Sequence, residues 1–221
     1  MNIIDKLKIK IFADGANFEQ FKLLRDSALV EGFTTNPTLM KNQGIKDYEM
    51  FAKQILSQVQ KKPISFEIFA DETNSIIKQA RYISSWAENV YVKVPVTNTK
   101  GEFLGEVIKT LSDEGVKLNI TAVFTNEQVR EISTVLNKNT KSIISIFSGR
   151  VADTGIDPIK HFRDCSEKYR KDNIEFLWAS PRELYNIFNA EEAGADIITI
   201  SLDLINKLKN IGKDLTEYSK E

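Results

Sequence analysis

The chain has 221 residues, of which 42% are hydrophobic and 28% charged, and its 30 Lys and Arg are balanced by 31 Asp and Glu. This composition is typical of one globular domain with a sizeable core, and the interspersed charge excludes a broad electrostatic surface for nucleic acid or an acidic membrane. The single Cys165 excludes an intramolecular disulfide, and with His161 as the only histidine we expect no transition-metal site, so chemistry must come from Lys, Asp, Glu, Ser, Thr or Arg.

The sequence contains no signal for membrane insertion or export. No uncharged apolar run approaches the roughly 20 residues that a membrane-spanning helix needs. The first fifteen residues lack the apolar centre of a signal peptide, because charged side chains interrupt them at Asp5, Lys6, Lys8 and Lys10. We expect a cytoplasmic protein without membrane partners.

Short β-branched runs alternate along the chain with longer segments of helical period. The expected strands are 9–14, 32–36, 64–69, 90–94, 118–124, 142–147, 175–180 and 195–200. The amphipathic segments between them include 45–60, 73–86, 101–114, 126–138, 156–170 and 181–193. Strands that alternate with helices in this way pair in parallel through helical crossovers.

Eight such units predict an α/β fold, a single (β/α)8 TIM barrel that spans residues 1–221. An open doubly wound sheet is the alternative, because periodicity identifies elements and does not show closure. An apolar pattern of helical spacing continues beyond the eighth strand, in Leu204, Leu208, Ile211 and Leu215. It predicts an extra C-terminal helix over about 202–218 that covers another part of the molecule.

Alternate residues of a barrel strand face either the surrounding helices or the barrel interior. In the first, third, fourth and fifth strands one parity is wholly apolar, which assigns it to the helix-facing side. The other parity then brings polar side chains into the barrel, namely Asp14, Glu67, Lys93, Asn119 and Thr121. These residues lie late in their strands, near the carboxyl ends at which barrel enzymes form their active sites.

Lys93 is the most informative of these residues, because lysine is almost never fully buried without a partner and here stands between Val92 and Val94. The structural interpretation is a salt bridge to Asp14 or Glu67. The chemical interpretation is a Schiff-base lysine: desolvation lowers the pKa of a lysine, and the neutral amine is the form that attacks a carbonyl. Nearby carboxylates would then move protons, and neighbouring amides and hydroxyls would hold the substrate.

The other interior residues also have structural interpretations. Asp14 could cap the following helix, Asn119 could fix a turn, and Thr121 could serve only as a β-former. The residue types alone leave both kinds of role open.

Two serine–arginine pairs follow the sixth and seventh strands, Ser145 with Arg150 and Ser180 with Arg182. The planar fork of arginine suits a phosphate dianion, and two such groups beside serine hydroxyls predict a phosphate clamp. The alternative is two surface arginines near helix starts. Neither glycine-rich phosphate fingerprint is present, so we expect no nucleotide cofactor.

Seven segments follow in order from about residue 9 to residue 205: IFADGAN, GFTTNPTLM, EIFAD, NVYVKVPVT, KLNITAVFT, SIISIFSGR and LWASPREL. Together they resemble the transaldolases, specifically the short-subunit group that also contains the fructose-6-phosphate aldolases. TTNPTL and VYVKVPVT are the specific pieces. The resemblance implies sugar-phosphate substrates, no metal or organic cofactor, and a homo-oligomer, with a ring as the expected assembly.

The resemblance also implies roles for individual residues. Lys93 would be the Schiff-base lysine, Asp14 the acid and base for carbon–carbon cleavage, and Glu67 and Thr121 the pair that positions the water used in carbinolamine dehydration. Substrate hydroxyls would be held by Asn36, Asn119 and Ser180. Phosphate would be held by Ser145, Arg150 and Arg182. One departure is visible, since Gly15 stands where many members have Thr after the aspartate.

Two positions separate the subgroups of this family. The aldolases resemble one another in having Gln at the position of Glu67 and Tyr at the position of Phe147, so this sequence is similar to the transaldolases at both. The implied reaction transfers a dihydroxyacetone unit from sedoheptulose 7-phosphate to glyceraldehyde 3-phosphate in the pentose phosphate pathway. The alternatives are a fructose-6-phosphate aldolase and a non-catalytic barrel that binds sugar phosphates.

Overall fold

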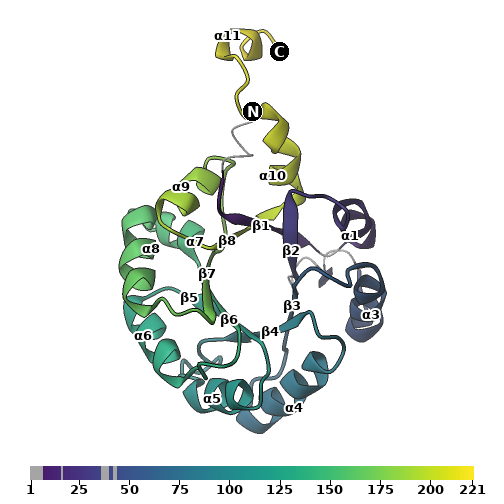
Figure 1. Cartoon of the computed structure of the whole chain (residues 1–221), viewed down its shortest axis with the longest axis vertical. Coiled ribbons are helices and arrows are strands. Elements are labelled where there is room, and N and C mark those ends of the chain that lie inside the picture. The colour runs from purple at the N-terminus through teal and green to yellow at the C-terminus, as the bar shows by residue number, and fades with distance from the viewer. Residues whose placement is uncertain (1–6, 16, 36–39, 42–43) are drawn as a thin grey trace.

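The computed structural model describes residues 7–15, 17–35, 40–41 and 44–221. In these residues eight parallel strands close into a barrel in chain order, with β8 paired to β1 (Figure 1). The strands are β1 Lys10–Gly15, β2 Val30–Thr35, β3 Ile64–Glu67, β4 Val90–Pro95, β5 Leu118–Val123, β6 Ser142–Ile146, β7 Ile174–Trp178 and β8 Ile197–Ser201. Closure of the sheet confirms the (β/α)8 barrel, and the open doubly wound alternative is wrong.

The described residues also form helices, which surround the barrel except at the C-terminal end of the chain, where the last helix lies outside the ring (Figure 1). They are α1 Phe18–Leu24, α3 Tyr48–Gln58, α4 Thr73–Ser84, α5 Gly105–Asp113, α6 Asn126–Val135, α7 Ser148–Ala152, α8 Pro158–Ser166, α9 Asn186–Glu192, α10 Leu202–Lys207 and α11 Leu215–Tyr218, with 3-10 segments η2 Glu167–Tyr169 and η3 Leu208–Asn210. The eight expected strands all form, with ends within two residues of those expected. In the part of the chain that the structure describes, no helix is long and apolar enough to cross a membrane.

Side-chain acceptors mark where several helices begin, because the first amides of a helix lack partners within it. At α6, Thr125 and Gln128 form a reciprocal capping box. At α1, Asn17 Oδ1 accepts from the amide of Glu19 at 2.9 Å. Asn17, rather than Asp14, therefore caps the helix after β1, and the Asp14 carboxylate is left to the barrel interior.

The chain after β8 differs from the expected continuous helix over about 202–218. The segment α10–η3 packs into the main core through Leu204 and Leu208. Gly212 then has a φ of +80°, a left-handed conformation that suits glycine and ends the helical path. Asp214 caps a separate short helix, α11, which extends away from the barrel (Figure 1). The expectation of one unbroken helix is wrong, because the apolar spacing continues across a residue that breaks the helix.

Apolar side chains pack on both sides of the barrel wall. Between strands and helices lies the main core, to which the strands contribute one parity, including Phe66, Val92 and Ile120. Inside the barrel lies a smaller cluster of Phe12, Tyr91, Ile143, Leu177, Ala179 and Ile197. This confirms which residues of each strand face the helices and which face the interior. The polar residues of the interior-facing set lie next to this cluster, toward the carboxyl ends of the strands.

Candidate active site

A cavity of about 360 Å³ opens at the carboxyl ends of the strands. Nine of the residues singled out in the sequence line it: Asp14, Lys93, Asn119, Thr121, Ser145, Phe147, Arg150, Ser180 and Arg182. Its other lining residues are Thr34, Leu177, Ala179, Pro181, Thr199 and Ser201. Glu67 reaches the site through its contact with Lys93. Asn36 lies outside the residues that the structure describes.

Lys93 on β4 lies beside Glu67 on β3, with which it pairs in the strand register. Its Nζ donates to Glu67 Oε2 at 3.1 Å and to the carbonyl oxygen of Thr35 at 3.0 Å. The Lys93 side chain is only 12% exposed. The salt bridge considered from the sequence is therefore present. It is compatible with the chemical interpretation, because a carboxylate in contact with the ammonium is also a base that can take its proton.

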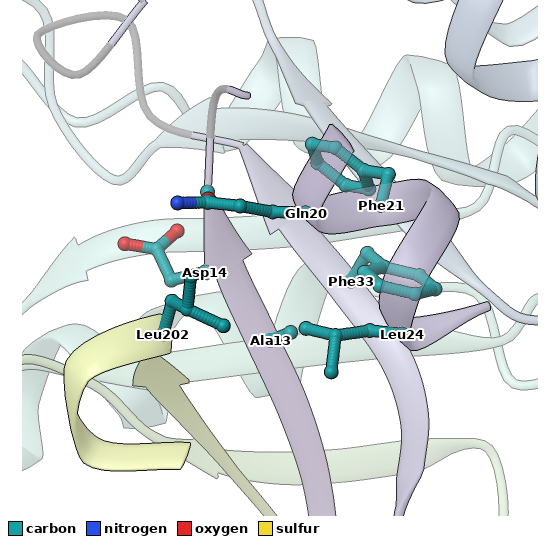
Figure 2. A pocket seen from close by; sticks show the side chains of 8 residues that line it. Ala13, Asp14, Gln20, Phe21, Leu24, Phe33 and Leu202 are labelled. Carbon is teal, nitrogen blue, oxygen red and sulfur yellow. The ribbon is translucent and has the colours of Figure 1, made fainter. Parts of the chain in front are cut away.

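Asp14 lies late in β1 and accepts a hydrogen bond from Thr34 Oγ1 at 2.8 Å. Figure 2 shows Asp14 together with Gln20 of α1 and Leu202 of α10, around a pocket of about 10 Å³ with a mostly apolar lining. A space of this size holds about one water molecule at most, and no substrate. Burial raises the pKa of Asp14, and the Lys93 ammonium and the Thr34 hydrogen bond oppose this shift. Asp14 is therefore a stronger base than an ordinary aspartate.

Asn119 is fully buried on β5, where two serine hydroxyls hold its amide. Its Nδ2 donates to Ser65 Oγ at 3.0 Å, and its Oδ1 accepts from Ser145 Oγ at 2.6 Å. These bonds join β3, β5 and β6 and fix the amide plane in the cavity wall. Because Asn119 lies within the strand and bonds to other strands, the interpretation that it fixes a turn is wrong.

Two non-glycine residues at the site have a left-handed backbone, which is costly and concentrates at functional sites. Ala122, directly after the cavity residue Thr121, has a φ of 56°, and Ser180 has a φ of 60°. Gly149 of α7 approaches Ser180 so closely that an added Cβ would lie 1.5 Å from the Ser180 carbonyl oxygen. Only glycine fits there, and it holds α7 against the segment that follows β7.

Arg150 of α7 and Arg182 after β7 form a cationic rim on the cavity. The Arg150 guanidinium carbon lies 5.1 Å from the centre of the Phe147 ring. Arg182 donates from Nε to Asp153 Oδ1 at 3.2 Å and from Nη2 to the other oxygen of the same carboxylate. Both arginines line the same cavity, as the predicted phosphate clamp requires, and Arg182 is paired there with Asp153.

The residues most suited to bind a soft metal lie elsewhere. His161 and Cys165 are one turn apart on α8, and neither lines the cavity. Burial raises the pKa of the Cys165 thiol to about 11, so this cysteine is an unreactive packing residue. In the described ranges, no group of three or more His, Cys, Asp or Glu side chains is arranged to hold a metal ion.

Sequence reasoning missed two threonines of the cavity, Thr34 and Thr199, whose hydroxyl oxygens are 2.6 Å apart. In β2, adjacent Thr34 and Thr35 occupy both parities, so alternation does not single out either of them. In β8, Thr199 stands between Ile198 and Ile200. Strand alternation, which places Lys93 in the interior, also predicts Thr199 as an interior polar residue.

The fold and the site define a (β/α)8-barrel protein with a cavity that combines an amine, a carboxylate and two arginines, with a second carboxylate bonded to the amine. The model of the family described as Transaldolase/Fructose-6-phosphate aldolase matches residues 11–221. The chain belongs to this family.

Relatives of similar length support the assignment. A "Probable transaldolase" of Lactiplantibacillus plantarum is 37% identical over 203 residues, which cover 90% of this chain and 88% of that protein. A "Probable transaldolase" of Methanococcus maripaludis strain C5 is 35% identical over 204 residues, which cover 91% and 90%. The solved structure of the "Putative Copper Homeostasis Protein CutC" from Streptococcus agalactiae has a TM-score of 0.63 at 12% identity, covering 86% of this chain and 97% of that one. At this low identity it shows the barrel fold alone.

Proposed function

We propose that this protein is a transaldolase that transfers a dihydroxyacetone unit from a ketose phosphate, sedoheptulose 7-phosphate, to an aldose phosphate, glyceraldehyde 3-phosphate. The observation that carries the proposal is the Lys93 amine inside a cavity that also contains Asp14, with Glu67 3.1 Å away. Membership of the family and the names of the relatives support the same activity.

Imine formation begins at Lys93. Its ammonium gives a proton to Glu67, and the free amine attacks the ketose carbonyl to form a carbinolamine. With Thr121 and a water molecule, Glu67 returns that proton to the carbinolamine hydroxyl, which leaves as water. The product is an iminium ion that joins Lys93 to the sugar.

Cleavage of the carbon–carbon bond follows at Asp14. Its carboxylate takes the proton of the hydroxyl on the carbon that will become the aldehyde, and the electrons of the broken bond move into the iminium to give an enamine. The raised pKa of Asp14 suits it to this step. The first aldose phosphate leaves, the enamine attacks a second one, and Asp14 returns the proton. Hydrolysis of the new imine frees Lys93.

Different parts of the cavity hold different parts of the substrate in this proposal. Arg150 and Arg182 bind the phosphate at the rim, and Asn119 and Ser180 bind hydroxyl groups nearer the lysine. Ser145 is predicted to add a hydroxyl to the phosphate site, and without substrate that hydroxyl donates to Asn119.

Phe147 favours transfer over the aldolase alternative. Its ring lines the cavity and packs against Phe124 with 5.5 Å between ring centres. A phenyl ring offers no proton, so the nucleophilic carbon of an enamine beside it stays unprotonated until an aldehyde binds. The interior lysine with its carboxylates argues against a barrel that only binds sugar phosphates, because binding needs the arginines and not an amine.

Reductive trapping tests the proposal. The protein is incubated with fructose 6-phosphate, reduced with borohydride and mapped by peptide mass spectrometry. We expect an adduct on Lys93 and none on Lys10, which also belongs to the interior parity but is paired with Glu175. Modification of a different lysine, or of none, would contradict the proposed mechanism.

A further inference from the structure

Side chains of three neighbouring strands meet inside the barrel beside the proposed base. Thr199 Oγ1 of β8 is 2.6 Å from Thr34 Oγ1 of β2, and Thr34 Oγ1 is 2.8 Å from Asp14 Oδ1 of β1, the strand between them. The register explains the meeting, since Asp14 pairs with Thr34 on one side of β1 and Phe12 pairs with Thr199 on the other. Both hydroxyls are buried, and they meet across the inner face of β1.

The number of protons fixes the direction of these hydrogen bonds. A threonine hydroxyl has one proton to donate, and an ionised carboxylate only accepts. Thr34 donates its proton to Asp14, so the proton between the two hydroxyls belongs to Thr199. Within the described residues neither hydroxyl has another partner. The chain of donors therefore starts at Thr199, passes through Thr34 and ends at the carboxylate.

This chain gives the two oxygens of Asp14 different environments. Oδ1 accepts from Thr34, whereas Oδ2 has no hydrogen-bond partner in the described part of the molecule. Oδ2 is thus the oxygen that remains available to a substrate hydroxyl. When Oδ2 takes a proton, Oδ1 becomes the carbonyl oxygen of the acid and still accepts from Thr34. No hydroxyl has to turn during the reaction, which is the advantage of a preorganised donor.

We propose that Thr199 and Thr34 are positioning residues for Asp14, which hold Oδ1 and leave Oδ2 to take the proton of the substrate. The proposal rests on the proposed function, in which Asp14 is the base for cleavage. The alternative is that both threonines only fill space on the barrel wall.

The surroundings of Asp14 predict how its titration responds. The charged groups that act on it are Lys93 of β4, which favours the carboxylate, and Glu67 of β3, which disfavours it. Gln20 of α1 and Leu202 of α10 lie beside it without charge (Figure 2), and β2 and β8 present hydroxyls. Removal of a donor hydroxyl therefore leaves the effect of burial less opposed and raises the pKa of Asp14.

Threonine-to-valine variants remove each hydroxyl and keep the shape. We expect Thr34→Val to lower kcat for cleavage about 10-fold and Thr199→Val about threefold, with KM unchanged. The acid limb of the kcat/KM profile should move to higher pH in both, and further in Thr34→Val. Thr199→Ser, which keeps a hydroxyl, should have the kcat of the wild type and an acid limb at the wild-type pH. Should Thr34→Val fail to fold, Thr199→Val and its serine rescue decide the question.

The double variant makes the test sharper. Because Thr199 acts through Thr34, Thr34→Val with Thr199→Val should be no slower than Thr34→Val alone. Two results would overturn the proposal. One is a double variant whose kcat falls by the product of the two single effects, and the other is a Thr199→Val variant whose kcat/KM profile has the same acid limb as the wild type.

Thr140→Val is the matched control. It removes another buried threonine hydroxyl, which donates to the carbonyl oxygen of Ser112 at 2.8 Å. We expect it to change stability and leave the pH profile unmoved. Borohydride trapping separates two failures. Absence of an adduct on Lys93 in the wild type refutes the proposed function. Normal trapping, together with an acid limb that stays at the wild-type pH in the threonine variants, refutes only the role of the threonines.

Discussion

Inside the barrel, an apolar cluster in the middle of the strands gives way to polar side chains at their carboxyl ends. Four strands make this change within two residues: Phe12 precedes Asp14, Tyr91 precedes Lys93, Ile143 precedes Ser145, and Ile197 precedes Thr199. Because alternate residues of a strand face the same side, each of these pairs lies along one line of the interior. The same strands thus build both a packed apolar cluster and, next to it, the cavity. We call this cluster the floor of the cavity; it consists of Phe12, Tyr91, Ile143, Leu177, Ala179 and Ile197.

The two ends contribute oppositely to stability. Full burial of an aliphatic or aromatic side chain stabilises a fold by about 1.5–3 kcal/mol, so the floor favours the native state. Burial of the Asp14 carboxylate opposes it, as the raised pKa of this group shows. Stability and chemistry are therefore separated along the strand axis. A substitution in the apolar cluster should therefore change mainly stability, whereas replacement of a buried polar residue of the cavity should change activity and can also relieve the cost of its burial.

Two lysine–glutamate pairs of the interior parity show the same contrast. Lys10 and Glu175 lie 2.5 Å apart near the amino ends, and their side chains are 44% and 32% exposed. The hydrogen bond to Glu175 raises the pKa of Lys10, which keeps that amine protonated. Lys93 and Glu67 are 12% and 24% exposed, and Lys93 faces the cavity.

The largest expected effect distinguishes these two lysines. Lys93→Met removes the proposed nucleophile and should lower kcat by a factor on the order of 10⁴ or more. Lys10→Met removes a partly exposed ion pair, which is worth about 1 kcal/mol of stability, and should leave kcat near that of the wild type. Steady-state transfer assays and circular dichroism of both variants check the pair. Equal losses of activity in the two variants would refute the conclusion that only the lysine at the carboxyl ends takes part in the reaction.

Asp14→Asn should lower activity and raise stability. Loss of the base should lower kcat by about 10²–10⁴-fold. Because the folded protein binds the Asp14 proton more tightly than the unfolded chain, the cost of ionising it is absent at low pH and fully present above its raised pKa. The variant should therefore be more stable than the wild type at neutral pH and lose this advantage below a pH of about 4. Urea unfolding at both pH values measures the difference, and a less stable variant at pH 7 would contradict it.

Ile197→Ala tests the floor. Ile197 is fully buried inside the barrel, two residues before Thr199. The truncation should cost about 2–5 kcal/mol of unfolding free energy, because a cavity replaces packed methyl groups. In the folded protein kcat/KM should stay within about twofold of the wild type. A large loss of kcat/KM with stability unchanged would show that the floor takes part in the chemistry.

The rim should respond with smaller changes in substrate affinity. Arg182→Ala and Arg150→Ala each remove charge-assisted hydrogen bonds worth about 1.5–3 kcal/mol, so KM for sugar phosphates should rise about 10- to 150-fold. Stability should change little, because both side chains are exposed. Kinetics with dihydroxyacetone as donor provide the comparison. If this unphosphorylated substrate loses as much, the arginines do not form a phosphate clamp.

Much of this architecture is predictable from the sequence because strand alternation carries it. Parity alone selects Lys93, Asn119 and Thr121 as interior residues, and all three line the cavity. Strand alternation does not place the two arginines of the rim, since Arg182 follows β7 in a segment without periodicity. Its position depends on the contact between Gly149 and Ser180, two residues far apart in the chain.

Apolar periodicity does not predict two features, one because it depends on non-local geometry and the other because it depends on a single glycine. The hydrogen bond between Thr34 and Thr199 requires a closed barrel, since β2 and β8 are distant in sequence and flank β1 only after closure. The break in the C-terminal helix depends on the backbone of Gly212, whereas the apolar spacing around it continues.

Phe147→Tyr is the smallest change and tests the type of reaction. Phe147 follows β6 on the parity of Ser145 and lines the cavity with Lys93, so a new hydroxyl at the ring edge would reach the intermediate directly or through one water. A phenol can protonate the enamine, after which hydrolysis releases free dihydroxyacetone. We therefore expect release to rise severalfold while transfer falls, with a further rise when Glu67→Gln is added. Stability should barely change, because the ring is half-buried beside a polar cavity that can solvate the hydroxyl. A coupled assay for free dihydroxyacetone measures the outcome. If the wild type already releases this product as fast as it transfers it, the aldolase alternative is correct and Phe147 is a packing residue.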